Sequence, residues 1–209
     1  MDFNKDGFIV LKGVISKDVG NFCTSYLHLR KQVTNTFLKT EYISRLNHSY
    51  GVWDDQQVPG SFSVYSDPAM EILLQICKPL LENISGKKLY ENYSYCRIYK
   101  KGDVLKKHTD RMECEISTTL NLGGDLWPIF LKNRKNKKVK VNLDPGDMLI
   151  YKGCKLEHWR EEFKGDHCVQ VFLHYNDVNT PGSEDRKYDT RPHLGLPGEY
   201  RKGEYFNYK

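Results

Sequence analysis

The sequence predicts a mainly β protein with supporting helices (α+β), in which short strands build a sandwich or barrel. From Lys88 onward, alternating apolar and polar residues are separated by Gly, Asn, Asp and Pro turns, as in Gly123-Gly124-Asp125. Fourteen tyrosines and frequent β-branched residues also favour strands. The strand candidates are 89–100, 113–122, 127–133, 138–143, 147–152 and 167–175.

The first part of the chain predicts a short strand and two helices. The clearer helix has Asp67 as its N-cap, Pro68 at its first position, a single apolar stripe and Gly86 at its end. It is expected to back a sheet. The other expected segments are a strand over 7–13, a helix from an N-cap at Ser16 to about Leu38, and irregular chain over 45–66.

The 209 residues fit a single domain. We expect an N-terminal strand and helices over about 1–87, a β core over about 88–178, and a tail or lid over about 179–209. No apolar run approaches 18 residues, and the N-terminus lacks a signal-peptide pattern. The six cysteines lack CxxC spacing, so we interpret them as free thiols in a cytoplasmic protein without membrane contact.

The net charge of +5 is concentrated in residues 132–140, which contain six lysines and arginines. This run favours a solvated hairpin turn. The alternative is a patch that contacts phosphate groups of nucleic acid or another polyanion.

A candidate metal site is formed by His108, Asp110 and the later His158. Two imidazoles and one carboxylate can hold non-haem Fe(II) on one face and leave the opposite positions open. Side chains two apart in a strand point the same way, so His108 and Asp110 are expected on one side of an extended segment. His158 would come from another strand folding back over the first. A bare HxD is weak evidence, and four other histidines lack partner spacing: His28, His48, His174 and His193.

Three segments together resemble the Fe(II)/2-oxoglutarate-dependent oxygenases, on the prolyl 4-hydroxylase side. Residues 97–110 (RIYKKGDVLKKHTD) are similar to that family's strand, tyrosine, glycine turn and HxD. Residues 120–124 (LNLGG) look like the next motif of that family along the chain. Residues 145–165 (PGDMLIY…LEH…G) look like the segment around its distal histidine. Residues 6–15 also resemble the first strand of the related phytanoyl-CoA type of enzyme.

The resemblance implies a double-stranded β-helix (jelly-roll or cupin-like) barrel that uses Fe(II) and 2-oxoglutarate to hydroxylate a C–H bond. Ascorbate is a further candidate cofactor. Peptidyl proline is the first candidate substrate, so the expected partner is a peptide, a protein or a small molecule. The alternatives are a small-molecule or amino-acid hydroxylase, a nucleic-acid demethylase, which is not favoured, and a catalytically inactive metal-binding module. The oligomeric state is left open.

The sequence departs from the family at the residue that binds the far carboxylate of 2-oxoglutarate. The family places an arginine or lysine nine to eleven residues after the distal histidine, where this chain has His167, Cys168 and Val169. Arg160 is the slightly preferred replacement, because a guanidinium grips a carboxylate with two bonds. The other candidate contacts are a protonated His167, Lys132, the family-like Tyr99, and Thr119.

Two details near His158 stay open. Arg160 could instead form an exposed ion pair with Glu161 or Glu162. Each ligating histidine also needs an acceptor for its second ring nitrogen, and Glu157 and Glu161 are the nearby carboxylates.

Overall fold

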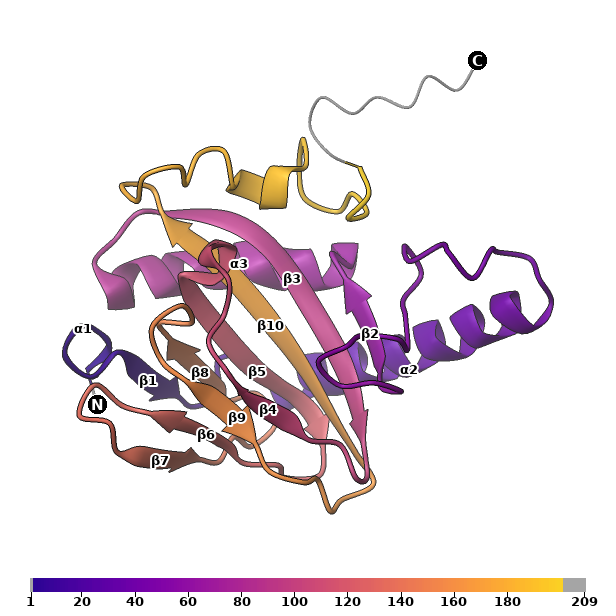
Figure 1. The fold of residues 1–209 in the computed structure, drawn as a ribbon, viewed down its shortest axis with the longest axis horizontal. Helices are drawn as coiled ribbons and strands as arrows, with labels where there is room; N and C mark the ends of the chain where they lie inside the picture. Colours follow the sequence, from indigo (N-terminus) through magenta and orange to yellow (C-terminus); the bar gives the residue numbers. More distant parts are fainter. Residues whose placement is uncertain (1, 201–209) are drawn as a thin grey trace.

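A computed structural model describes residues 2–200. The chain alternates helices with short strands at first and then continues almost entirely as strands (Figure 1). The elements are α1 Phe3–Asp6, β1 Phe8–Leu11, α2 Lys17–Lys39, β2 Phe62–Tyr65, α3 Pro68–Ser85, β3 Leu89–Lys100, β4 Leu105–His108, β5 Ile116–Gly124, β6 Ile129–Lys132, β7 Lys138–Val141, β8 Met148–Tyr151, β9 His158–Arg160 and β10 His167–Asp177, with 3-10 turns at Met112–Cys114 and Lys187–Thr190.

The strands form two antiparallel sheets that face each other as a double-stranded β-helix, which confirms the expected fold class. The larger sheet has the order β1-β8-β5-β10-β3-β2, and the smaller has the order β4-β9-β6-β7. From β3 onward, consecutive strands therefore alternate between the sheets, except for the hairpin β6–β7, and Figure 1 shows this alternation for β8, β9 and β10.

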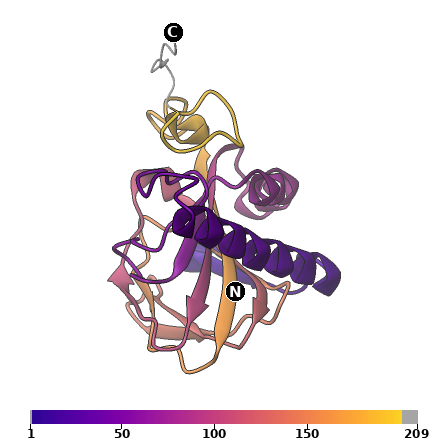
Figure 2. The same ribbon diagram turned by 90° about the vertical axis from the view of Figure 1, so that its right-hand side faces the viewer.

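Helices α2 and α3 cover the outer face of the larger sheet (Figure 2). Their ends are where the sequence predicts them. The Ser16 side chain accepts a hydrogen bond from the Val19 amide, and Asp67 accepts two from the first turn of α3. Gly86 ends α3 in a left-handed conformation with φ of 69°, which glycine adopts without steric cost.

Period-2 alternation assigns the side chains of the larger sheet to two compartments. In β10, Val169, Val171 and Leu173 pack in the core under the helices, whereas Gln170 and His174 point into the barrel. Strands β3 and β5 repeat this pattern. Their inward-facing side chains are polar or aromatic, so the barrel interior carries Arg97, Tyr99, Ser117 and Thr119.

The structure corrects three expected segments. Residues 45–66 are not wholly irregular, because β2 pairs with β3 at the edge of the larger sheet. That strand has four residues and depends on a distant partner, so local periodicity does not reveal it. The candidate strand 113–122 begins only at Ile116, since a 3-10 turn precedes it. The strand candidates read from periodicity also omit β4 and β9, which are too short to show alternation, although His108 and His158 were expected on strands.

The described part of the C-terminal segment packs on the sheet rather than extending away from it. Arg191 and Glu71 form an ion pair of 2.7 Å, and both side chains are almost fully buried. The Ser66 hydroxyl also donates to the Leu196 carbonyl. The expected tail continues into residues 201–209, which lie outside the described residues. No described helix is long and apolar enough to cross a membrane.

Candidate metal centre

The three predicted metal ligands meet where β4 lies against β9. His108 is the last residue of β4 and pairs directly with His158, the first residue of β9. His158 therefore comes from a strand that folds back over the first, as predicted. Asp110 differs slightly from expectation, because the strand stops at His108 and Asp110 follows it. The Asp110 amide is held by a hydrogen bond to the Gly153 carbonyl.

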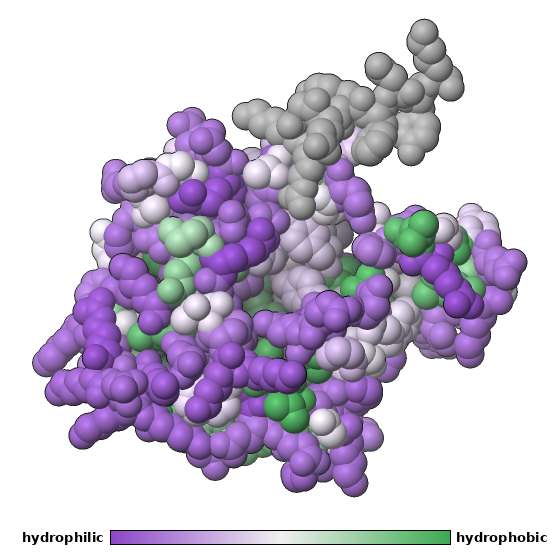
Figure 3. All heavy atoms as spheres, viewed as in Figure 1, coloured by the Kyte–Doolittle hydropathy of each residue, from purple (hydrophilic) through white to green (hydrophobic). Residues whose placement is uncertain are grey.

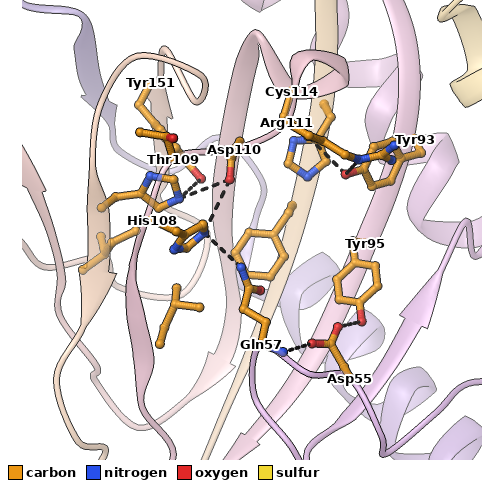
Figure 4. A pocket seen from close by; sticks show the side chains of 15 residues that line it. Asp55, Gln57, Tyr93, Tyr95, His108, Thr109, Asp110, Arg111, Cys114 and Tyr151 are labelled. Atoms are coloured by element: carbon orange, nitrogen blue, oxygen red, sulfur yellow. Dashed lines mark hydrogen bonds and ion pairs between the residues drawn. The ribbon is translucent and has the colours of Figure 1, made fainter.

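The ligand atoms of His108, Asp110 and His158 all lie within 4.8 Å of one another. Figure 4 shows His108 facing Asp110 at one side of the pocket. Oδ1 of Asp110 is 3.5 Å from Nε2 of His108 and 3.4 Å from Nε2 of His158. The two imidazole rings are 4.3 Å apart, centroid to centroid. One carboxylate oxygen and two imidazole nitrogens thus converge on one point, and this donor set suits Fe(II).

The chain orients the two histidines in the same way. Nδ1 of His108 contacts the Lys106 carbonyl at 2.8 Å, and Nδ1 of His158 contacts the Leu156 carbonyl at 2.9 Å. In each ring a carbonyl two residues earlier accepts a hydrogen bond from Nδ1–H, so Nε2 is left as the lone-pair donor for a metal. Neither Glu157 nor Glu161 serves here, because their carboxylates pair with surface lysines.

Asp110 is fixed from behind by a serine and a glycine. The buried Ser117 hydroxyl donates to Oδ2 of Asp110 at 2.7 Å and lies 3.1 Å from Nδ1 of His174. A Cβ on Gly153 would stand 2.3 Å from Oδ2 and 2.4 Å from the Ser117 oxygen. Only glycine therefore fits beside this carboxylate, and Oδ1 is left facing the histidines.

The electrostatics of Asp110 favour its charged form. Burial alone would raise the pKa of Asp110, but the hydrogen bonds with His108 and His158 outweigh burial and lower it far below the ordinary range. Burial lowers the pKa of His108, but hydrogen bonds to Asp110 and to the Lys106 carbonyl raise it. The net effect is a raised pKa. The carboxylate is thus ready to bind a cation.

Arg160 lies inside the barrel, two residues beyond His158 on the same face of β9. Its side chain is 1% exposed, so the predicted alternative of an exposed ion pair with Glu161 or Glu162 is wrong. Nη1 donates to the Trp127 carbonyl, and Nη2 donates to the Thr119 hydroxyl at 3.3 Å. Nε is buried without a hydrogen-bond partner.

The charge of Arg160 is unbalanced among the described residues. Three arginines in the described part of the chain are almost fully buried. Arg97 pairs with Asp55 at 2.7 Å, and Arg191 pairs with Glu71. Within residues 2–200 no carboxylate forms an ion pair with Arg160. A buried charge needs a partner, so this guanidinium is suited to an anionic ligand.

Tyr99 and Thr119 share the compartment of Arg160. The Tyr99 ring stands edge-on to Trp127 at 4.7 Å, and the Tyr99 hydroxyl accepts from Arg97 at 3.4 Å. The Thr119 hydroxyl donates to the Gln170 side chain at 2.9 Å while it accepts from Arg160. Both predicted co-substrate residues therefore lie beside the guanidinium.

The structure places His167 and Lys132 elsewhere. His167 stands edge-on to His28 of α2 at 5.2 Å, on the helix-covered side of β10. Lys132 pairs with Glu157 at 2.7 Å, and both side chains are more than one-third exposed. The side chains of His167 and Lys132 are each 39% exposed. Of the three predicted cationic contacts, Arg160, His167 and Lys132, only Arg160 combines burial with an interior position.

A hollow of about 340 Å³ opens beside the metal ligands and contains residues that the sequence did not indicate. Nε2 of Gln57 lies 2.9 Å from Nε2 of His108 (Figure 4). Oε1 of Gln57 accepts from Arg97 at 3.1 Å, and Asp55 binds both Arg97 and the Tyr95 hydroxyl. Gln57 and Asp55 lie in the irregular chain before β2, where no motif marks them.

Comparison with solved structures supports the fold. A Pseudomonas putida prolyl-4-hydroxylase matches 85% of this chain and 96% of its own, with a TM-score of 0.65 and 12% identity. HygX from Streptomyces hygroscopicus, solved with nickel and 2-oxoglutarate, matches 85% of each chain, with a TM-score of 0.61 and 15% identity. EctD from S. alaskensis, with 2-oxoglutarate and 5-hydroxyectoine, matches 84% of this chain and 74% of its own, with a TM-score of 0.59 and 15% identity.

No protein-family model matches the sequence, and no curated protein sequence matches it. The structural likeness at these identities establishes the fold alone. The chain thus has the fold of the Fe(II)/2-oxoglutarate oxygenases, as the sequence resemblance implied.

Proposed function

We propose that the protein is an Fe(II)- and 2-oxoglutarate-dependent dioxygenase that hydroxylates a C–H bond. One observation carries the proposal: the His108–Asp110–His158 cluster and a buried arginine without a carboxylate partner occupy the same barrel. A cation site and an anion site are what a metal-chelating dicarboxylic acid requires.

His108, Asp110 and His158 would hold the metal. Their Nε2, Oδ1 and Nε2 atoms supply two neutral donors and one charge, which leaves three positions of an octahedral ion for other ligands. Bound Fe(II) would supply the redox chemistry by which O2 converts 2-oxoglutarate to succinate and CO2 and inserts one oxygen atom into a substrate C–H bond. Ser117 and Gly153 keep Asp110 turned so that one of its oxygens faces this ion.

Arg160 would bind the far carboxylate of 2-oxoglutarate. Its Nε is unsatisfied and its Nη2 hydrogen bond to Thr119 is long, so the guanidinium can donate two hydrogen bonds to a carboxylate. Tyr99 and Thr119 would contribute hydroxyls beside it. The rings of Trp127 and Tyr99 are buried around this end, and such a low-dielectric environment would strengthen a charge pair with the carboxylate.

For the substrate we propose two candidates. Peptidyl proline rests on the sequence resemblance and on the structural likeness to a prolyl-4-hydroxylase. A small polar molecule is favoured by the hollow of about 340 Å³, which has a size typical of small-molecule sites and carries polar groups from Asp55, Tyr95 and Arg111. HygX has been solved with hygromycin B, and EctD with 5-hydroxyectoine.

Succinate formation from 2-oxoglutarate tests the proposed activity. The purified protein should produce succinate with Fe(II) and O2, and His158→Ala should produce none. Stimulation by a prolyl peptide or by a small-molecule library separates the two substrate candidates, and adding ascorbate tests that cofactor. Metal binding without 2-oxoglutarate binding or succinate would contradict the proposal and favour an inactive metal-binding module.

A further inference from the structure

A second hollow, of about 450 Å³, lies away from the metal ligands between the β6–β7 turn and the loop that joins β8 to β9. The basic run 132–140 forms the expected hairpin, and its turn folds against this loop. Long hydrophilic side chains gather over the left-hand ends of β6 and β7 in Figure 3. The residues lining the hollow are Lys132, Asn133, Arg134, Asn136, Lys152, Lys155, Leu156 and Glu157.

Three of the four cations in this hollow lack a carboxylate partner within residues 2–200. Lys132 pairs with Glu157 at 2.7 Å. Arg134 donates only to the Lys5 carbonyl, and Lys152 and Lys155 form no ion pair among the described residues. The hollow therefore concentrates positive charge that the fold does not neutralise.

The charged form of Lys152 is disfavoured by this cluster of cations. It is half-buried, its Nζ lies over the Phe3 ring at 5.2 Å, and its amide is fixed to the Gly7 carbonyl. Burial lowers the pKa of Lys152, and repulsion from Arg134 and Lys155 lowers it further. An anion seated among the three side chains would relieve that repulsion.

We infer that this hollow is a binding site for a phosphate group, held between Arg134, Lys152 and Lys155 and distinct from the proposed active site. A guanidinium offers paired N–H donors and the two ammonium groups offer point charges, which together suit a tetrahedral dianion. The phosphate could belong to a phosphorylated small molecule or to a nucleic-acid backbone, and both present the same chemistry to these residues.

Calorimetric titration of the full chain tests the site with three probes: inorganic phosphate, pyrophosphate and a single-stranded oligodeoxynucleotide. We expect saturable binding of pyrophosphate or the oligonucleotide, weakened about tenfold or more in each of the single variants Arg134→Gln and Lys152→Gln. Tighter binding of the oligonucleotide with a steep salt dependence would assign a nucleic-acid source, and pyrophosphate alone would assign a small molecule.

Lys135→Gln is the matched control. It removes the same charge from the same hairpin, but Lys135 does not line the hollow. This variant should bind like the wild type. The inference is overturned if none of the probes binds saturably, or if Lys135→Gln weakens binding as much as each change inside the hollow does. The second result would show diffuse attraction to the whole basic hairpin.

Discussion

His108 and His158 lie directly opposite each other in the antiparallel pair β4–β9, with their rings 4.3 Å apart. Side chains alternate between the two faces of a sheet, so a shift of one residue in this register would turn one histidine out of the barrel. The three-residue strand β9 thus fixes two functional positions at once, because Arg160 follows His158 on the same face.

Loss of one ligand should greatly weaken metal binding. His158→Ala leaves two of the three donors, and we expect its affinity for Fe(II) or Ni(II) to fall by a factor of a hundred or more, on the scale of losing a charge-assisted contact. Competition with a chromogenic chelator measures this affinity. His28→Ala, on α2, is the control and should retain one metal ion per chain. Wild-type affinity in His158→Ala would remove His158 from the site.

The support behind Asp110 should tune metal affinity without touching the metal. Ser117→Ala removes the hydrogen bond to Oδ2, and we expect about 10- to 100-fold weaker metal binding, which is typical of losing such a partner. Gly153→Ala should act in the same direction, because its Cβ would displace the carboxylate. Ser94→Ala is the matched control, since the Ser94 hydroxyl is buried without a partner. If Ser117→Ala and Gly153→Ala bind metal as tightly as Ser94→Ala does, Ser117 and Gly153 do not support Asp110.

Gln57 should compete with the metal rather than assist it. Its amide nitrogen lies 2.9 Å from Nε2 of His108, the atom that would bind the ion. Metal entry must break this contact, so Gln57→Ala should bind metal as well as the wild type or up to about fivefold more tightly. The neighbouring exposed Gln56→Ala should show no change. Metal binding tenfold weaker in Gln57→Ala would instead identify its side chain as a further ligand.

Burial of His174 should make the metal-free protein sensitive to acid. Burial lowers the pKa of His174 from its ordinary value of 6.5 to about 4. Below pH 6.5 the His174 imidazole is protonated in the unfolded chain but stays neutral in the folded state. This difference lowers the free energy of unfolding, so the stability that is present above pH 6.5 is lost as the pH falls toward 4. At about 1.4 kcal/mol per pH unit, the full loss is about 3 kcal/mol.

Urea unfolding with a chelator present, at pH 7 and at pH 4.5, measures this loss. His174→Gln keeps a hydrogen-bonding group near Ser117 but does not titrate, so its stability should fall less between the two pH values. The same pH dependence in both proteins would show that other groups cause it.

The sequence could predict the parts of the fold that depend on residues close together in the chain. Asp67, Pro68 and Gly86 mark the ends of α3 because capping chemistry depends on neighbouring residues. The ligands His108, Asp110 and His158 were predictable because their order resembles that of a known family. Their convergence is a property of the β4–β9 register.

The rest of the site depends on contacts that cross the barrel. Ser117 and Gln57 come from distant segments and carry no motif, so only the folded chain brings them to Asp110 and His108. The position of Arg160 shows the same limit. From sequence spacing alone, the Arg160 side chain could be exposed or interior with equal weight. In the folded chain it lies on the same face of β9 as His158, and this makes it interior.

The most direct test of the account is calorimetric titration of 2-oxoglutarate into the metal-loaded protein, without O2. The wild type should bind one molecule per chain. Arg160→Gln should bind about tenfold or more weakly, the scale of one charge-assisted pair, whereas His167→Ala and Lys132→Ala should bind like the wild type. The ligand-free Arg160→Gln protein should be no less stable, because an unbalanced buried charge has been removed. Normal 2-oxoglutarate affinity in Arg160→Gln would contradict the central claim that this arginine binds the far carboxylate of the co-substrate.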